Sequence, residues 1–411
     1  MSEVSLSQLE VQVAALRKGG EQLRGLDRLR IAMAVGQAVR DLADPNQFFA
    51  LSLRRGLHME TGLSLPMIEW GLSQLAASFE QHALESLCAY CEPRGEVRLV
   101  APRLSAVILA NTVFTASLGA LALPLLAKSP VVVKVPRTGA ALVAAFAEHL
   151  NTLDVDVGRH LLVAAFGRDE ETKSAALWRH ADVVSAYGDD ATMATLRSCV
   201  PPSARLIEHG HGLSAAFISA QSISSSTKLN DVARRLALDV AAYDQTGCLS
   251  PQFAFVESQE AASAVQFAQA LSAALGEVEA QLPRGRVPVE VAAQLMQWRG
   301  VAGACGELHA SKHHACAVES GDLRFGPGYR HISIYPCSSS QQALERLSPL
   351  GAHLKSLGIA GMASDRAALA AQIPAGLTPR LCQLGTMQSP PLDAYFDGQA
   401  PFFGLLNYIQ H

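Results

Sequence analysis

The chain has 411 residues, of which 49% are hydrophobic and 17% charged, and its formal net charge is −4. A chain of this length can bury two separate hydrophobic cores, and its apolar content indicates a folded globular protein. The slight negative charge argues against a nucleic-acid-binding protein, because such proteins carry a basic surface. We therefore expect no nucleic-acid partner.

The sequence shows neither a membrane span nor a secretory signal. Its most apolar window, residues 116–127, is well short of the ~20 residues that a spanning helix needs. Residues 1–10 lack the basic and apolar regions of a signal peptide. The eight cysteines are scattered along the chain, as is typical of reduced thiols, so we expect a cytoplasmic protein.

Two groups of cysteines have spacings that raise the question of a redox or metal site. Cys88 and Cys91 have redox-motif spacing, but they end a helical segment with no strand–helix–strand pattern beside it. The second group fits no common zinc spacing; it consists of Cys305, His309, His313, His314 and Cys316. We expect a helix end at the first group, a surface loop at the second, and no metal.

Residues 1–95 are predicted to form a helical lead-in. Apolar residues recur at helical spacing over residues 26–42, and Pro45 and Pro66 each stand where a further helix can begin. The segment contains no catalytic motif. We expect it to pack on the domain that follows.

Residues 96–212 alternate between short apolar strands and helices. The strands are predicted at residues 107–109, 131–135, 161–166 and 183–187. This alternation is typical of a doubly wound parallel sheet, which binds ligands beyond the carboxyl ends of its strands. The candidate residues at those ends are Asn111, Lys134, Gly167 and Gly188. The Gly-x-Gly-x-x-Gly fingerprint of an ordinary Rossmann domain is absent.

The residues at these strand ends suit a phosphate-bearing cofactor. Lys134 follows three valines and offers a cation for a phosphate or ribose, although a lysine at a strand end can also simply reach water. Gly188 leaves room for a pyrophosphate beside the N-terminus of the next helix. Asp189 is expected to cap that helix. Residues 96–212 are therefore predicted to bind a cofactor.

A second alternation of strands and helices begins at residue 213. Within it, residues 244–252 form a short polar turn between a helical pattern over 229–243 and a strand at 253–256. The turn holds Cys248; Gly247 lets the backbone approach a ligand, and the N–H groups around the cysteine can face a developing oxyanion. Cys248 is a candidate nucleophile, and the alternative is a small buried side chain, as free cysteines often are.

The predicted fold class is therefore α/β, with two doubly wound domains and the active site in the cleft between them. Residues 213–385 form the domain that carries the thiol, and less regular sequence is expected over residues 276–328. Residues 386–411 form a tail that returns towards the cofactor domain or a dimer interface.

Motifs in this order resemble the aldehyde dehydrogenase superfamily. Asn111 stands where that superfamily has the Asn of its Pro-Trp-Asn-Phe-Pro motif, and Cys248 lies 40 residues after Glu208, where the catalytic thiol is expected. The other matching segments are Val132-Val133-Lys134-Val135-Pro136, Ala186-Tyr187-Gly188-Asp189, Glu208-His209-Gly210, Phe325-Gly326-Pro327 and Pro401-Phe402-Phe403-Gly404. The resemblance runs from Glu96 to the C-terminus and implies an aldehyde-dehydrogenase-like fold.

Within the superfamily, the chain more closely resembles the LuxC-type acyl-CoA reductases. The segments that carry this resemblance are His211-Gly212-Leu213-Ser214, Asp244-Gln245, Cys248-Leu249-Ser250-Pro251-Gln252, Leu384-Gly385-Thr386-Met387 and Asp397-Gly398. Those enzymes reduce a fatty acyl thioester to an aldehyde with NADPH. The resemblance implies that Cys248 is acylated and that Asn111 stabilises the oxyanion. It also implies an NADPH cofactor (NADH being the other option) held by Lys134, Gly167, Gly188 and Asp189.

Two departures from the superfamily pattern bear on the mechanism. The Glu that binds the nicotinamide ribose in the superfamily is replaced here by Leu323. Glu208 matches the base that hydrolyses an acyl-enzyme, a step that a reductase does not use. His209 and His211 lie beside it and are candidates for moving protons, the alternative being ordinary loop histidines.

The resemblance implies an acyl-CoA or acyl-carrier thioester as substrate. Residues 93–102 leave little room for a projecting hairpin, so we expect a homodimer formed mainly by the thiol domain. Three alternatives stay open. The chain could oxidise an aldehyde to an acid or acyl-CoA, could be a non-catalytic scaffold, or could work only with an acyltransferase or acyl-protein synthetase partner.

Overall fold

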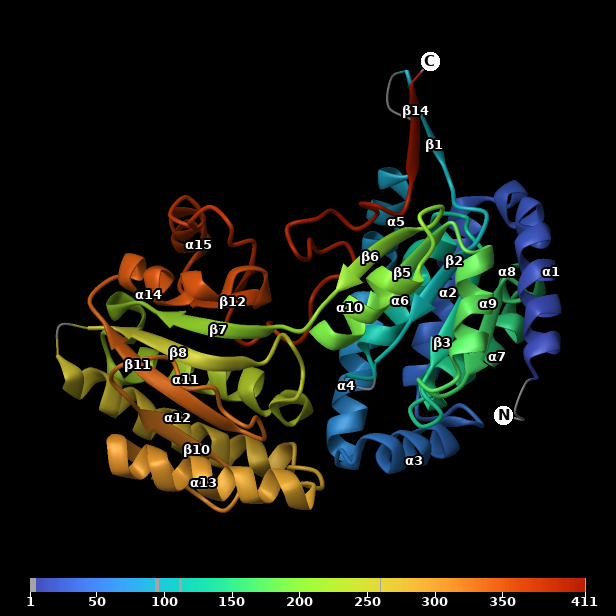
Figure 1. Cartoon of the computed structure of the whole chain (residues 1–411). Helices are drawn as coiled ribbons and strands as arrows, with labels where there is room; N and C mark the ends of the chain where they lie inside the picture. The colour runs from blue at the N-terminus through green and yellow to red at the C-terminus, as the bar shows by residue number, and fades with distance from the viewer. Residues whose placement is uncertain (1–4, 93–95, 111–112, 259, 411) are drawn as a thin grey trace.

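The structure is a computed structural model that describes residues 5–92, 96–110, 113–258 and 260–410. Two α/β bodies lie side by side, and each is built around its own large sheet (Figure 1). We call them the N-terminal body (residues 5–210) and the thiol body (residues 213–385). In the described parts of the chain, no helix has both the length and the apolar character needed to cross a membrane.

Five helices precede the first large sheet. They are α1 (Leu6–Gly25), α2 (Arg28–Ala43), α3 (Ala50–Thr61), α4 (Leu65–Ser78) and α5 (Gln81–Tyr90). Ser5 and Ser64 cap α1 and α4 with side-chain oxygens that accept backbone N–H groups, which is why serine is favoured there. Pro45 lies in a turn, so the helix predicted to begin there starts at Ala50 instead.

The helix predicted from Pro66 towards Cys91 is in fact two helices, because the backbone leaves the helical conformation at Phe79 and is extended at Glu80. Cys91 caps the end of α5 and Cys88 lies in its last turn, which confirms the helix-end prediction. Burial raises the pKa of the Cys91 thiol to about 11.

The sheet of the N-terminal body is parallel, with the strand order β4-β3-β2-β5-β6. Its strands are β2 (Ser105–Ile108), β3 (Val131–Val135), β4 (Leu161–Ala165), β5 (Val183–Tyr187) and β6 (Arg205–His209). The helices between them are α6 (Ala116–Leu126), α7 (Ala141–Leu153), α8 (Val155–Gly158), α9 (Glu171–His180) and α10 (Asp190–Cys199).

Strand β3 shows how both faces of this sheet are covered. Val131, Val133 and Val135 lie in one core with side chains of α2, α6 and α7, whereas Val132 lies in a second core with side chains of α9 and α10. A strand buried on both faces needs an apolar residue at every position, so the run of valines follows directly from its place. The lead-in helices α2 to α5 contribute to the first core.

The thiol body holds a seven-stranded sheet with the order β13-β12-β7-β8-β11-β10-β9, parallel except for the β9–β10 pair. Its strands are β7 (Leu213–Ile218), β8 (Pro251–Glu257), β9 (Glu307–Ala310), β10 (Ala315–Val318), β11 (His331–Cys337), β12 (Leu354–Ala360) and β13 (Arg380–Gln383). Its helices are α11 (Ser226–Ala241), α12 (Ala261–Gln281), α13 (Val289–Cys305), α14 (Ser340–Leu347) and α15 (Ala363–Ala370).

The prediction of irregular sequence over residues 276–328 is wrong, because helix α13 and strands β9 and β10 lie there. The expected surface loop at the Cys/His group is likewise wrong. Cys305 ends α13, His309 lies in β9, and Cys316 is fully buried in β10. β9 is a four-residue edge strand with little alternation of apolar and polar residues. It forms a strand because it pairs with β10, and its own sequence does not predict one.

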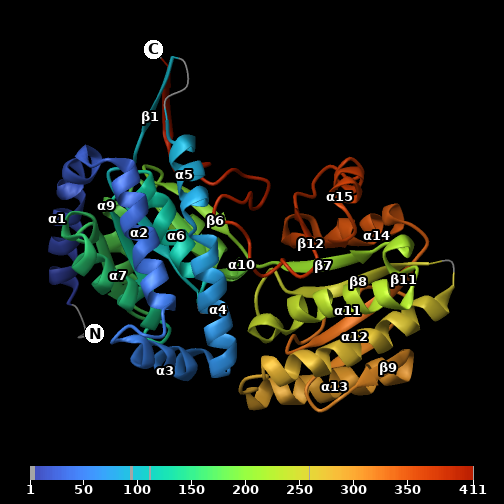
Figure 2. The ribbon, with the colours of Figure 1, turned by 180° about the vertical axis from the view of Figure 1, so that it is seen from behind.

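The C-terminal tail returns to the N-terminal body (Figures 1 and 2). Phe402, Leu405 and Leu406 are buried in the core of that body. Beyond them, β14 (Asn407–Gln410) pairs antiparallel with β1 (Val97–Val100), and the two strands form an arm that projects from the molecule. The arm is thus made by two segments far apart in sequence rather than by a hairpin within residues 93–102.

Candidate active site

Cys248 lies on the loop between α11 and β8, and three consecutive left-handed residues introduce this loop. Helix α11 ends at Ala241, and Tyr243, Asp244 and Gln245 have φ values of 51°, 53° and 61°. The helix predicted through Tyr243 therefore stops two residues early. A left-handed non-glycine residue costs roughly 1–2 kcal/mol, so the surrounding contacts must hold this turn in place.

Buried polar groups hold the turn. Gln245 donates its side-chain amide to the carbonyl oxygens of Pro251 (2.8 Å) and His331 (2.9 Å), and its side-chain oxygen accepts the His331 N–H at 2.7 Å. Arg330, which is fully buried, donates to the Asp244 carboxylate at 2.9 Å. The Asp244 carboxylate also accepts the Gly285 N–H at 2.8 Å. Burial raises the pKa of Asp244, although Arg330 opposes this shift.

Cys248 is an exposed residue, and the backbone around it is held by hydrogen bonds and close packing. The Ser214 hydroxyl donates to the Cys248 carbonyl at 2.9 Å. A Cβ atom at Gly247 would lie only 2.8 Å from Val113 of the N-terminal body, so glycine allows the loop to approach that body closely. Burial among the surrounding protein raises the pKa of the Cys248 thiol, and the charge of Lys355 partly opposes this. Cys248 therefore lies on a loop that is exposed to solvent and fixed in place by its backbone contacts.

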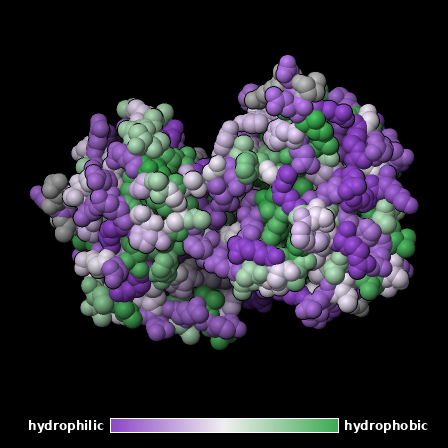
Figure 3. All heavy atoms as spheres, turned by 45° about the horizontal axis from the view of Figure 1, so that its top comes forward, coloured by the Kyte–Doolittle hydropathy of each residue, from purple (hydrophilic) through white to green (hydrophobic). Residues whose placement is uncertain are grey.

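Side chains from both bodies and from the tail surround the thiol. The face of the molecule in Figure 3 is hollowed between the two bodies. Lys355 of β12 pairs with Asp397 of the tail at 2.6 Å, and His209 Nδ1 of β6 lies 3.5 Å from the same carboxylate. The His209 ring stacks on Tyr187 of β5 with 4.3 Å between the ring centroids. Burial, and then the charges of Asp397 and Cys248, raise the pKa of Tyr187.

Three neighbouring residues that the sequence suggested for catalysis, Glu208, His209 and His211, make contacts in different places. Successive residues of a strand face opposite sides, and His209 and Glu208 are neighbours on β6. The exposed Arg197 of α10 donates from Nε and Nη2 to the two oxygens of the Glu208 carboxylate, and the Nε–Oε1 distance is 2.8 Å. His211 is exposed, and its carbonyl accepts from His353 at 3.0 Å. Only His209 joins the group with Lys355 and Asp397.

The strand ends of the N-terminal body present one buried cation. Lys134 is 7% exposed and lies over the Phe166 ring at 5.6 Å, and burial lowers the pKa of its ammonium group. Within the described residues, no carboxylate lies within salt-bridge distance of it. A buried cation without a carboxylate partner fits an anionic group of a dinucleotide cofactor. Asn111, the predicted oxyanion residue, lies outside the described residues.

The predicted cofactor residues Gly167, Gly188 and Asp189 also lie at these strand ends. Asp189 caps α10 by accepting the Thr192 N–H at 2.7 Å, as the sequence predicted. Gly167 donates its N–H to Glu170 at 2.9 Å. Carboxylates of the chain itself therefore already occupy two of the backbone donor sites at these strand ends.

A carboxylate from the helical lead-in binds a third set of backbone N–H groups at these strand ends. Glu60 accepts the N–H groups of Ala140 and Ala141 at 3.1 Å each and so caps α7. This contact ties α3 to the carboxyl-end edge of the sheet, where α7 begins. No motif in the sequence marks Glu60 as a cap, because its partners lie some 80 residues away along the chain.

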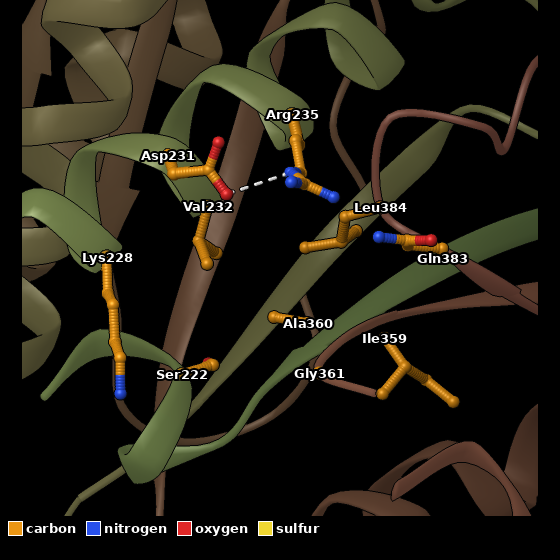
Figure 4. A pocket seen from close by; sticks show the side chains of 10 residues that line it. All are labelled: Ser222, Lys228, Asp231, Val232, Arg235, Ile359, Ala360, Gly361, Gln383 and Leu384. Carbon is orange, nitrogen blue, oxygen red and sulfur yellow. Dashed lines mark ion pairs between the residues drawn. The ribbon is translucent and has the colours of Figure 1, made fainter. Parts of the chain in front are cut away.

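A second hollow, with a volume of about 210 Å³, lies at the opposite end of the thiol-body sheet (Figure 4). It lies where β12 and β13 end, whereas Cys248 precedes the start of β8, which runs parallel to them. Arg235 and Asp231 in its wall form an ion pair at 2.9 Å. This hollow is therefore separate from the thiol site.

The two bodies, each built on a largely parallel sheet, have the fold of the aldehyde dehydrogenases. A structure of aldehyde dehydrogenase 21 from Physcomitrella patens in complex with the reaction product succinate has this fold. It matches with a TM-score of 0.75 at 12% identity, over 99% of this chain and 90% of that one. An NAD-dependent benzaldehyde dehydrogenase from Corynebacterium glutamicum matches with a TM-score of 0.72 at 14% identity, over 100% and 91% of the two chains.

The family is more specific than the fold. The acyl-CoA reductase (LuxC) family matches residues 92–408, and the chain belongs to that family. A search of curated protein sequences found no match. The predicted resemblance, the α/β fold class and the assignment as an oxidoreductase are confirmed, and an acyl-reductase type of function with a nicotinamide cofactor follows from the family.

Proposed function

We propose that the protein reduces a fatty acyl thioester, carried by CoA or by a carrier protein, to an aldehyde through an acyl-enzyme on Cys248. The observation that carries the proposal is an exposed thiol on a loop whose backbone is clamped by Gln245 and Ser214. A fixed backbone holds its N–H groups in place for a developing oxyanion, which is worth about 2.7–4 kcal/mol per donor. Asn111 is proposed as the second donor.

Acylation forms a bond from the Cys248 sulfur to the thioester carbonyl carbon and breaks the bond from that carbon to the carrier sulfur. The thiolate is the nucleophile, so the thiol proton has to be moved as the sulfur attacks. We assign this proton transfer to His209, which delivers the proton to the departing carrier thiolate. Asp397 beside Nδ1 stabilises the charged ring in between.

The nicotinamide cofactor, when bound, supplies the hydride that reduces the acyl-enzyme. The resulting hemithioacetal on Cys248 then collapses to the aldehyde and the free thiolate, which takes one proton from solvent. Lys134 is proposed to bind a phosphate or ribose of the cofactor. Gly188 is proposed to leave room for the cofactor pyrophosphate. We propose NADPH as the natural cofactor, as in the LuxC-type enzymes that the sequence resembles.

The contacts of Glu208 favour reduction over hydrolysis. A hydrolytic base must be free to take a proton from water, whereas this carboxylate is paired with Arg197. Leu323, in place of the ribose-binding carboxylate of the oxidising enzymes, packs against the core of the thiol body. Both observations disfavour the aldehyde-oxidising alternative.

We further propose a cytoplasmic homodimer. The sequence analysis expected it to form mainly through the thiol domain, but the β1–β14 arm offers a second contact surface. All eight cysteines are free thiols, which suits a reducing compartment. In the arm, β1 and β14 pair with each other, so both are edge strands. Tyr408 and Ile409 of β14 are 64% and 50% exposed. Exposed apolar side chains on a strand edge suit pairing with a second copy of the chain. Light scattering of the purified protein tests this, and a monomer at micromolar concentration would contradict it.

The central test is the mass of the intact protein after incubation with a panel of acyl-CoAs in the absence of reductant. We expect one acyl adduct, located on Cys248 by peptide mass and discharged as aldehyde when NADPH is added. The matched control is Cys199→Ala, which removes another exposed thiol and should leave the adduct unchanged. An adduct that water discharges equally fast without NADPH would mean a thioesterase or dehydrogenase.

A further inference from the structure

The tail brings an acidic residue to the thiol site on a tight turn. Phe396 and Gln399 exchange two backbone hydrogen bonds, of 3.1 and 2.8 Å, and Asp397 and Gly398 between them have φ values of 53° and 73°. Two successive left-handed residues make this a type I′ turn, for which Asp-Gly is a preferred sequence. A Cβ atom at Gly398 would lie 2.9 Å from Thr378, so the turn packs closely on the thiol body.

Lys355 reaches this turn because β12 is irregular at that point. Leu354 and Ser356 pair with consecutive residues of β7, so Lys355 is the extra residue of a bulge, a feature that re-aims a side chain. Its stem lies over Gly212, where a Cβ atom would come within 2.2 Å of Lys355 Cγ. Ser356 pairs with Ser214, whose hydroxyl holds the Cys248 carbonyl. The bulge therefore places the lysine next to the thiol loop.

The tail is also anchored beside the same loop. The buried Asp239 accepts the N–H groups of Gly385 at 2.6 Å and Met387 at 2.9 Å. The next residue, Gln388, donates to Ser250 at 3.3 Å, at the end of the Cys248 loop. The position of Asp397 is thus fixed at both the start of the tail and its turn.

We propose that Lys355 and Asp397 are positioning residues, a charge pair that orients His209 and sets the reactivity of Cys248. The charged and titratable groups around the thiol are Lys355, Asp397, Tyr187 and, through Asp397, His209. The lysine favours the thiolate and the aspartate disfavours it, so each partner limits the effect of the other. Burial opposes ionisation of Asp397, but its bonds to His209 and Lys355 outweigh burial and lower its pKa.

The pair makes opposite predictions for its two members. Asp397→Asn leaves the Lys355 cation unbalanced near the thiol, so the thiolate is favoured and alkylation becomes faster. Lys355→Met leaves the carboxylate unbalanced, so alkylation becomes slower. One unit charge near a partly solvated thiol changes the rate by roughly 3- to 10-fold. A pair that merely stabilised the fold would shift both variants in the same direction.

The test is the pH dependence of iodoacetamide alkylation at Cys248 in the full chain, measured by peptide mass with Cys199 as the internal reference. We expect Asp397→Asn to be faster than wild type near neutral pH, Lys355→Met slower, and Lys355→Arg close to wild type. The control is Arg234→Met, which removes an exposed pair with Glu277 and should change nothing.

Two outcomes would overturn the proposal. One is equal or same-direction changes in the two variants. The other is labelling of the fully buried Cys316, which would show that the pair holds the fold instead of tuning the thiol. The inference uses the proposed function only for the role of Cys248. Alkylation needs neither acyl donor nor cofactor, so absence of aldehyde product would count against the proposed function alone.

Discussion

Replacing Arg330 by methionine tests how the thiol loop is held. Arg330 is 0% exposed and donates to Asp244 at 2.9 Å and to Glu279 at 2.6 Å. Removing one partner of a buried ion pair typically costs about 3–5 kcal/mol, because the other charge stays buried. Three left-handed residues, at roughly 1–2 kcal/mol each, store roughly 3–6 kcal/mol in the turn before Cys248. The stabilisation lost with Arg330 is therefore comparable to the cost of the left-handed turn, and the turn can relax in its absence.

We expect Arg330→Met to lower the midpoint of urea unfolding of the thiol body and to reduce acylation of Cys248. The assays are circular dichroism during urea titration and the mass of the acyl adduct. Asp244→Asn removes the buried carboxylate charge that Arg330→Met leaves without a partner. The double variant should therefore recover much of the stability lost by Arg330→Met. Additive losses in the double variant would refute the reasoning, since they would mean that the two side chains do not act on each other.

Four further predictions concern the nucleophile, the cofactor and the direction of the reaction. Cys248→Ala should abolish the acyl adduct and aldehyde formation while cofactor affinity, measured by fluorescence titration, stays unchanged; an adduct in this variant would place the nucleophile elsewhere. Lys134→Ala should weaken NADPH binding by roughly 10- to 100-fold, the worth of a hydrogen bond to a charged group, with acylation little changed; the reverse pattern would place the cofactor elsewhere. Glu208→Gln should lower thioester reduction by less than the ~10²–10⁴-fold typical of a lost general base, as measured by single-turnover discharge; rapid hydrolysis that is lost in this variant would contradict the reductase assignment. Because burial raises the pKa of Cys248, its alkylation rate should keep rising with pH, and a plateau below about pH 8 would contradict that shift.

Local patterns in the sequence determined the parts of this protein that depend on neighbouring residues. The valines of β3 and the turns after the strands predicted a doubly wound sheet, because a strand buried on both faces needs unbroken apolar sequence. The capping of α10 by Asp189 was also predicted, since a cap acts within one helical turn. The polar turn at Cys248 and the family resemblance identified the candidate nucleophile.

The tertiary structure alone decided which side chains meet at that thiol. His209, Lys355 and Asp397 come from β6, from a bulge in β12 and from the tail, and no spacing in the sequence relates them. The sequence matched Glu208 to a hydrolytic base and offered His209 and His211 as groups that move protons, but it could not show what each side chain faces. The pleat of β6 turns Glu208 towards Arg197 and His209 towards Asp397. Such charge pairs form between segments brought together by the packing of both bodies, so they depend on long-range contacts that a local pattern does not encode.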